Sequence, residues 1–120
     1  MRVIHATEVP GQVGTTFTGP VEMRRVVDLQ NREGMSVSLV RFEDGARTNW
    51  HIHPGEQILL IVEGQGRVGT ATEEFAVSPG DVVYCAPNER HWHGAQPGQQ
   101  MAHFSVTNIG APTWFESPTE

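Results

Sequence analysis

Glycine and proline interrupt this 120-residue chain so often that no stretch shows a helix-like apolar periodicity. The chain has 13 glycines and 8 prolines, and the segments between them are rich in the β-branched and apolar residues that favour strands. Many short strands with frequent turns, such as those at 63–66 and 78–81, are typical of an all-β sandwich or barrel. We predict strands over 21–27, 35–42, 48–53, 57–63, 66–70, 74–77, 81–85, 91–94, 101–108 and 113–115.

The length and charge of the chain limit the classes of protein to which it can belong. A chain of 120 residues with a formal net charge of −6 predicts one domain over 1–120 and argues against binding to nucleic acid or to an anionic membrane. The longest apolar run, 58–62, is too short to span a bilayer, and the first residues lack the apolar core of a signal peptide. The single cysteine, Cys85, ends an apolar strand and is expected in the core. We therefore expect a cytoplasmic protein.

The histidines are grouped in a way that suits a metal ion. Residues two apart on a strand point to the same face, so His51 and His53 would present two imidazoles side by side. A Pro-Gly turn follows, Gln57 opens the next apolar strand, and His91 lies in a later strand segment. A hydrogen-bonded core histidine is the alternative at each position taken singly. The grouping instead predicts a site for a divalent ion such as Mn, Fe, Co, Ni or Zn, held by His51, His53, Gln57 and His91.

Two motifs in these segments resemble those of the cupins. Gly45-x5-His51-x-His53-x3-Gln57-x6-Gly64 resembles the first cupin motif, and Pro79-Gly80-Asp81-x9-His91 resembles the second. The resemblance implies a double-stranded β-helix, that is, a jelly-roll barrel with its metal inside, with 35–108 as the core region. One departure is chemical, because Gln57 stands where most cupins carry glutamate. A neutral ligand set leaves the charge of the ion uncompensated and makes it a stronger Lewis acid.

A closer resemblance is to the small bacterial manganese cupins that act as hydroxynitrile lyases, often grouped with carboxymuconolactone-decarboxylase-associated cupins. Segments 17–19, 45–48, 50–54, 79–83 and 91–95 carry it. It implies manganese as the ion on His51, His53, Gln57 and His91, with His93 and His103 as the two further, catalytic histidines. Strand alternation and the resemblance together place Ser38, Val40 and Thr107 in the substrate pocket.

In the lyase interpretation, the metal polarises the oxygen of a small hydroxy or carbonyl compound, and neutral His93 or His103 moves the proton. His93 is otherwise a residue that orients a ligand, and His103 a core histidine bonded to Ser38 or Thr107. Three other functions are alternatives. The first is an Fe(II)-dependent dioxygenase, and the second is a uronate isomerase. The latter needs a pocket arginine, for which Arg47 and Arg67 are the candidates, although both are expected at the surface. The third is a non-catalytic small-molecule sensor or storage protein.

The same alternation predicts an interface. Trp50 and Trp92 alternate with the histidines and should point away from the site, and the strand over 101–108 has apolar residues on both faces. Apolar groups on the outside of a small barrel need cover, so we predict a homodimer or a higher homo-oligomer. Residues 116–120 are expected to form a frayed or partner-bound tail, and Arg24-Arg25 a charge pair at a strand edge.

Overall fold

The computed structural model describes residues 1–29 and 34–118, and nearly all its regular structure is β-strand. The one helical element in this part of the chain is a 3-10 turn, η1 (Ala6–Glu8), and no described helix is long and apolar enough to cross a bilayer. The strands are β1 (Gln12–Val13), β2 (Phe17–Thr18), β3 (Val21–Asp28), β4 (Ser36–Phe42), β5 (Arg47–Thr48), β6 (His51–Ile52), β7 (Gln57–Gly64), β8 (Gly66–Gly69), β9 (Glu74–Val77), β10 (Val82–Cys85), β11 (Trp92–Ala95), β12 (Met101–Thr107) and β13 (Thr113–Trp114).

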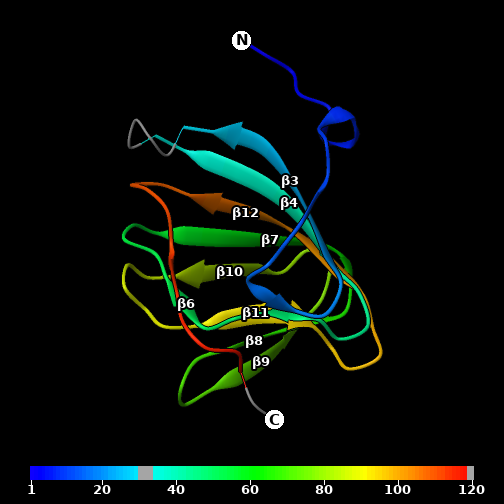
Figure 1. Ribbon diagram of the computed structural model, residues 1–120, viewed down its shortest axis with the longest axis vertical. Coiled ribbons are helices and arrows are strands. Elements are labelled where there is room, and N and C mark those ends of the chain that lie inside the picture. The colour runs from blue at the N-terminus through cyan, green and yellow to red at the C-terminus, as the bar shows by residue number, and fades with distance from the viewer. Residues whose placement is uncertain (30–33, 119–120) are drawn as a thin grey trace.

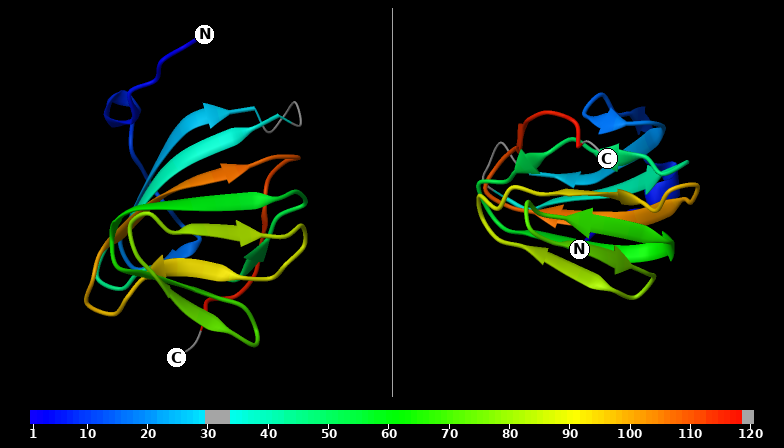
Figure 2. Two further views of the ribbon diagram at one scale, coloured as in Figure 1. Left: turned by 180° about the vertical axis from the view of Figure 1, so that it is seen from behind. Right: turned by 90° about the horizontal axis from the view of Figure 1, so that it is seen from below.

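Two antiparallel sheets face each other and enclose the interior (Figures 1 and 2). One sheet has the strand order β1-β3-β4-β12-β7-β10, and the other has β2-β5-β11-β8-β9. A short third sheet pairs β13 with β6. Sequence neighbours often lie in different sheets, as in a jelly roll. The predicted all-β jelly-roll barrel is therefore confirmed.

Most predicted strands are present, but the strand predicted over 48–53 was wrong. The chain leaves one sheet after β5 and enters another at β6, and His53 lies just beyond the end of β6. His91 likewise precedes β11 and joins His51 through an isolated antiparallel bridge. Alternation along one continuous strand therefore does not explain how these histidines meet. Two short strands that the sequence did not reveal, β1 and β2, lie near the entrance to the interior.

The apolar core fills one part of the space between the sheets. Phe42, Leu59 and Met101 are almost completely buried there. On β7, Gln57, Leu59 and Ile61 are buried whereas the residues between them are exposed, which is the alternation expected of a strand with one face in a core. Cys85 is also buried, as predicted, and burial raises the pKa of its thiol to about 12. The core ends against the histidines, because the Phe42 ring packs on His93 and His103.

Arginines of the same chain cover both tryptophans, Trp50 and Trp92, so neither needs a partner protein to cover it. Trp92 is buried between the guanidinium groups of Arg47 and Arg67, which lie 4.9 and 5.5 Å from its ring centre. Arg90 covers Trp50 in the same way, at 5.1 Å. The expectation that Arg47 and Arg67 lie at the surface was wrong, because cation–π contacts and backbone carbonyls hold both in the interior of the fold.

The chain end beyond β13 is also better anchored than expected. Pro118 is buried and its carbonyl accepts a hydrogen bond from Arg47, while Glu116 forms an ion pair with Arg90. Residues 116–118 are thus packed onto the barrel rather than frayed, and residues 119–120 of the predicted tail lie outside the described residues.

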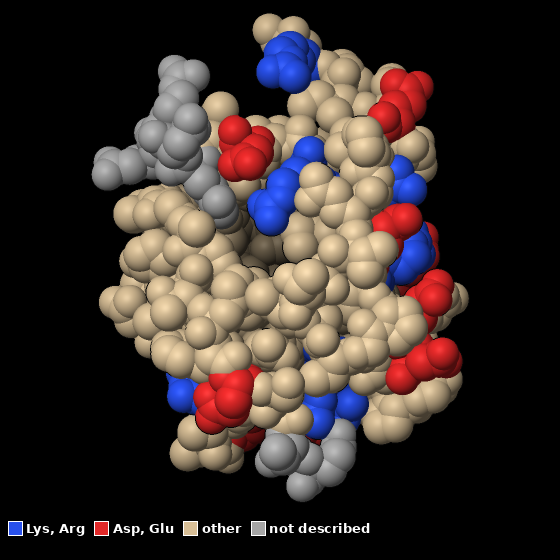
Figure 3. Space-filling model, in the orientation of Figure 1, with Lys and Arg blue, Asp and Glu red and all other residues tan. Residues whose placement is uncertain are grey.

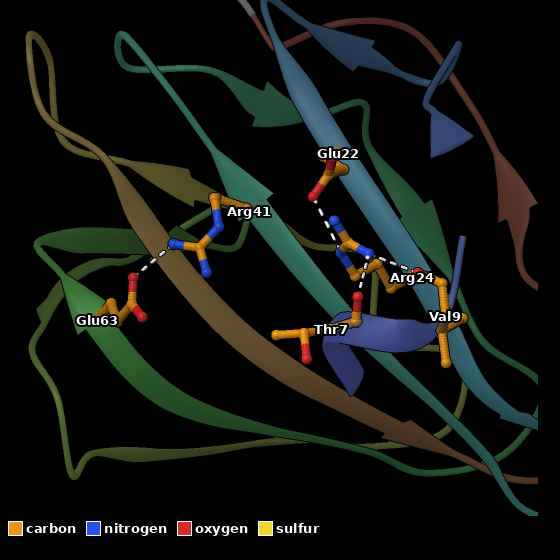
Figure 4. A network of polar contacts seen from close by, with 6 residues as sticks. All are labelled: Thr7, Val9, Glu22, Arg24, Arg41 and Glu63. Atoms are coloured by element: carbon orange, nitrogen blue, oxygen red, sulfur yellow. Dashed lines mark hydrogen bonds and ion pairs between the residues drawn. The ribbon is translucent and has the colours of Figure 1, made fainter. Parts of the chain in front are cut away.

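Exposed apolar side chains gather instead on the outer face of the larger sheet. Leu60 lies opposite Val82 on β10, and Ile58 lies opposite Tyr84. On the other side of β7 the same two residues lie opposite Phe104 and Val106 of β12. We call these six residues the outer apolar stripe. Charged pairs occupy other positions of this sheet, where Arg41 of β4 meets Glu63 and Arg24 of β3 meets Glu22 (Figure 4).

Candidate metal centre

A cavity of about 390 Å³ opens between the two sheets and reaches the histidines. Its walls include His51, His53, Gln57 and His93. Hydroxyl and aromatic side chains complete the lining, among them Ser36, Ser38, Thr48, Ser105, Thr107, Phe17 and Trp114. The three residues that the sequence placed in a pocket, Ser38, Val40 and Thr107, all line this cavity. A cavity of this size accommodates a small organic molecule.

Backbone hydrogen bonds bring the two halves of the histidine cluster together. His51 and His91 donate to each other's carbonyls, both at 3.0 Å, which sets their rings 4.3 Å apart between centres. The ring centre of His53 lies 5.2 Å from that of His51. Gln57, the first residue of β7, places its Oε1 atom 2.9 Å from Nε2 of His91. His51, Gln57 and His91 therefore meet at one place, with the His53 ring beside His51, but the third histidine in the described group of close ligand atoms is His93 and not His53.

Two backbone carbonyls determine which nitrogen of each imidazole carries the proton. Nδ1 of His51 lies 2.9 Å from the carbonyl of Asn49, and Nδ1 of His91 lies 2.9 Å from that of Glu89. A carbonyl only accepts, so Nδ1 of each ring must donate. In a neutral imidazole the other nitrogen, Nε2, then holds a lone pair. This arrangement, with one ring nitrogen donating to a carbonyl and the other free, is typical of metal-ligating histidines.

The protonation of His91 on Nδ1 makes its contact with Gln57 unusual. The amide nitrogen of Gln57 donates to Ser105 Oγ at 2.8 Å, which leaves Oε1 turned toward His91. If Nδ1 of His91 donates to Glu89, a neutral His91 has no proton for Oε1, and two lone pairs face each other at 2.9 Å. Two acceptors at this distance repel each other, and a cation bound to both removes the repulsion. The donor set thus fits a divalent ion.

Other buried nitrogens point to the same requirement. Both ring nitrogens of His53, Nε2 of His93 and Nδ1 of His103 are buried, with no hydrogen-bond partner among the described residues. A buried polar atom without a partner costs about 1–3 kcal/mol. Ligand atoms of His51, His91 and His93 all lie within 4.8 Å of one another. The cluster therefore contains more buried ring nitrogens than the hydrogen bonds among the described residues satisfy. This excess is expected of a site that binds a metal ion.

Burial keeps these histidines neutral. Burial, followed by the proximity of His91 as a second cause, lowers the pKa of His51 to about 2 and that of His53 to about 4. Burial likewise lowers the pKa of His91, despite its hydrogen bond to the Glu89 carbonyl. At neutral pH each imidazole therefore offers a lone pair, which is the form that binds metals.

His93, a member of this group of three histidines, also forms a hydrogen-bonded pair with His103. Nδ1 of His93 lies 2.9 Å from Nε2 of His103, so the two rings share one proton. Burial lowers the pKa of His93 well below its usual value and that of His103 to about 4. The alternative in which Ser38 or Thr107 binds His103 was wrong, since its partner is His93. Only His93 of the pair lines the cavity.

Several residues near the cluster were not singled out from the sequence. Trp114 of β13 packs on the His51 ring at 4.4 Å, and Thr48 Oγ1 accepts the backbone N–H of His93 at 3.1 Å. Ser105, which orients Gln57, alternates with His103 and Thr107 on β12, so its place beside the site was available from the strand pattern. Arg25 also lines the cavity.

Comparisons with known proteins agree with this geometry. The cupin domain family matches residues 38–108, which is more than half of the chain. An (R)-mandelonitrile lyase of Granulicella tundricola is 39% identical, over 87% of this chain and 82% of that protein. A cupin-like protein of Thermotoga maritima is 38% identical, with a TM-score of 0.86 over 92% of this chain and 88% of that one.

More distant structures share the fold alone. A polyketide cyclase of Streptomyces resistomycificus is 18% identical, with a TM-score of 0.81 over 100% of this chain and 87% of that chain. The family match, the lyase relative and the arrangement of the strands are mutually consistent. This chain therefore belongs to the cupin family.

Proposed function

We propose that this cupin is a metal-dependent lyase that cleaves small hydroxynitriles into a carbonyl compound and hydrogen cyanide. The observation that carries the proposal is the neutral donor set, in which carbonyl-bound His91 turns its lone pair toward Gln57 Oε1 beside the ring of carbonyl-bound His51. The relative named as an (R)-mandelonitrile lyase supports the reaction class. We propose His51, His53, Gln57 and His91 as the ligands and manganese as the ion. A divalent ion there would supply a Lewis acid that polarises the substrate oxygen.

The His93–His103 pair would handle the proton. In this proposal Nδ1 of His93 donates to Nε2 of His103, so that Nε2 of His93, which lines the cavity and has no partner among the described residues, holds a lone pair and can take the hydroxyl proton of a hydroxynitrile. As the O–H proton leaves, its bonding electrons form the carbonyl and the C–C bond to the nitrile breaks, releasing cyanide. The proton on His93 then passes to cyanide. Because Nδ1 of His93 is bonded to His103, the second ring shares the positive charge that arises in between.

An Fe(II)-dependent dioxygenase, a uronate isomerase and a non-catalytic sensor are the other functions compatible with a cupin barrel. The neutral Gln57 argues against the first, because a carboxylate ligand is common at oxygenase iron. The additional pair, His93 and His103, argues against the non-catalytic alternative, because the site of a purely structural ion is usually closed.

We also propose that the protein is a homodimer joined through the outer apolar stripe. Ile58, Leu60, Val82 and Tyr84 are between 38% and 62% exposed, and no charged residue belongs to the stripe. A two-fold axis would place the same uncharged surface on both subunits, with the ion pairs of Figure 4 left in water. A second copy of the chain therefore fits this surface better than a charged partner.

The ligand set predicts different effects for two histidine substitutions. We expect His53→Ala to weaken manganese binding by at least about tenfold, because a first-sphere donor is lost. Exposed His5, far outside the motifs, supplies the control His5→Ala, which should bind like the unmodified protein. Calorimetric titration of the metal-free protein measures both. Unchanged binding by His53→Ala, together with loss in His93→Ala, would show that His93 takes the place of His53.

The proton-transfer role predicts a variant that keeps its metal but loses activity. The double variant His93→Ala/His103→Ala should retain bound manganese and lose at least about 100-fold in the rate of mandelonitrile cleavage. Metal content and turnover are measured on the same sample, with His5→Ala again as the control. Full turnover in the double variant would contradict the assignment.

The interface predicts that one charge separates the subunits. Leu60→Glu should convert a dimer into a monomer, because it buries an unpaired carboxylate in the interface. Val3→Glu, a matched change at an exposed apolar residue outside the stripe, should leave the dimer intact. Light scattering after size-exclusion chromatography measures the mass. A monomeric unmodified protein, or a dimer that survives Leu60→Glu, would overturn the proposal.

A further inference from the structure

The cavity carries a single fixed charge at its wall. Among the described residues that line it, Arg25 is the one charged side chain, and neither aspartate nor glutamate is present. Arg25 is exposed, whereas the histidines at the other end are buried. Figure 3 shows the face that is hollowed, with a basic side chain at the rim of the hollow.

The position of Arg25 follows from the register of β3 and β4. Arg25 lies opposite Ser38, and Met23 lies opposite Val40; all four line the cavity. The register shifts between Arg25 and Val27, where a β-bulge interrupts the ladder. Ser36 Oγ donates to the carbonyl of Val27 at 3.1 Å within this bulge. The Arg25 side chain therefore lies on the cavity side of the sheet, near Ser36 and Ser38. It does not lie on the outer face as one of a pair with Arg24.

Five other arginines of the barrel already have structural partners. All eight basic residues of the chain are arginines. Arg24 bonds Glu22 and the carbonyls of Thr7 and Val9, and Arg41 bonds Glu63 (Figure 4). Arg47, Arg67 and Arg90 stack on aromatic rings. By contrast, the Arg25 guanidinium has no hydrogen bond or ion pair to residues 1–29 or 34–118. Its charge is thus available to a ligand.

We propose that Arg25 binds the carboxylate of the substrate, so that the site acts on a small organic acid. A planar guanidinium matches a carboxylate with two parallel hydrogen bonds, and the hydroxyl of Ser38, which lies opposite Arg25, is an additional donor at this end. Phe17, Met23 and Val40 form an apolar middle section that suits the carbon skeleton. The hydroxyl or carbonyl of the same molecule would lie at the histidine end. This last point rests on the proposed function, whereas the carboxylate contact does not.

The test compares two probes of similar size and shape, one anionic and one neutral. Para-hydroxymethylbenzoate carries a carboxylate and a hydroxyl at opposite ends, and para-hydroxymethylbenzamide replaces the carboxylate with a neutral amide. Calorimetry on the full chain should give about tenfold tighter binding of the benzoate, as expected of a charge-assisted pair near solvent. In Arg25→Gln the two probes should bind equally, with the amide unaffected. Arg41→Gln removes the same charge on the outer face and should keep the preference.

The measurement is repeated after chelation, which separates this proposal from the metal proposal. Loss of the preference in Arg25→Gln under both conditions supports the carboxylate contact even if the lyase assignment fails. A preference that survives in Arg25→Gln would show that the carboxylate binds elsewhere, and overturns the proposal. Arg25→Lys keeps the charge without the planar pair of donors and should retain only part of the preference. The full preference in this variant would contradict two-point binding.

Discussion

Two hydrogen bonds from imidazole nitrogens to backbone carbonyls determine the chemistry of this barrel. Asn49 and Glu89 each accept from the histidine two residues later, and this leaves Nε2 of His51 and His91 without a proton. The isolated bridge between these histidines brings the two lone pairs together, and Ser105 turns the Gln57 oxygen toward them. Without a cation, two hydrogen-bond acceptors, Nε2 of His91 and Oε1 of Gln57, face each other. The polar end of the interior could therefore hold a divalent ion, and the apolar core packs against it.

The burial that builds the site also limits its chemistry. Each imidazole lies in a region where the charged form is disfavoured, so neutral nitrogen donors surround the position proposed for the ion. No carboxylate offsets the charge of a divalent ion there, and the described lining adds one more positive charge, Arg25, at the entrance. A cavity with this distribution favours an anionic or readily ionised ligand. The proposed lyase chemistry and the proposed organic-acid substrate both follow from this excess of positive charge.

Turn residues and β-rich segments were sufficient to predict the all-β class, and the resemblance to two cupin motifs was sufficient to predict that His91 joins His51, although strand alternation was the wrong reason for the grouping. Prediction from the sequence failed where the outcome depends on how strands are shared between sheets. The segment over 48–53 reads as one strand, yet Asn49 and Trp50 carry the chain from one sheet to another. The contact between His93 and His103 joins β11 and β12, which lie in opposite sheets. Spacing along the chain contains no information about such a contact.

The positions of the arginines in the fold were also difficult to predict from the sequence. Arg47 and Arg67 were expected at the surface because arginine is rarely buried, but each stacks on Trp92 from a different strand. Arg25 was paired with Arg24 as a charge at a strand edge, yet alternation places the two on opposite faces of β3. That face becomes a cavity wall only when β4 and the segment over 12–17 are in place. Pocket residues supplied by distant segments are thus the least accessible to sequence analysis.

Nitrogen NMR of the histidine side chains in the metal-free protein tests the central claim most directly. At neutral pH, His51 and His91 should both show a protonated Nδ1 and an unprotonated Nε2, and addition of zinc should shift the Nε2 signals while leaving the Nδ1 signals nearly unchanged. If either ring carries its proton on Nε2, or is doubly protonated at neutral pH, its lone pair is not available at the cluster. That result would contradict the account of the metal centre on which the proposed function depends.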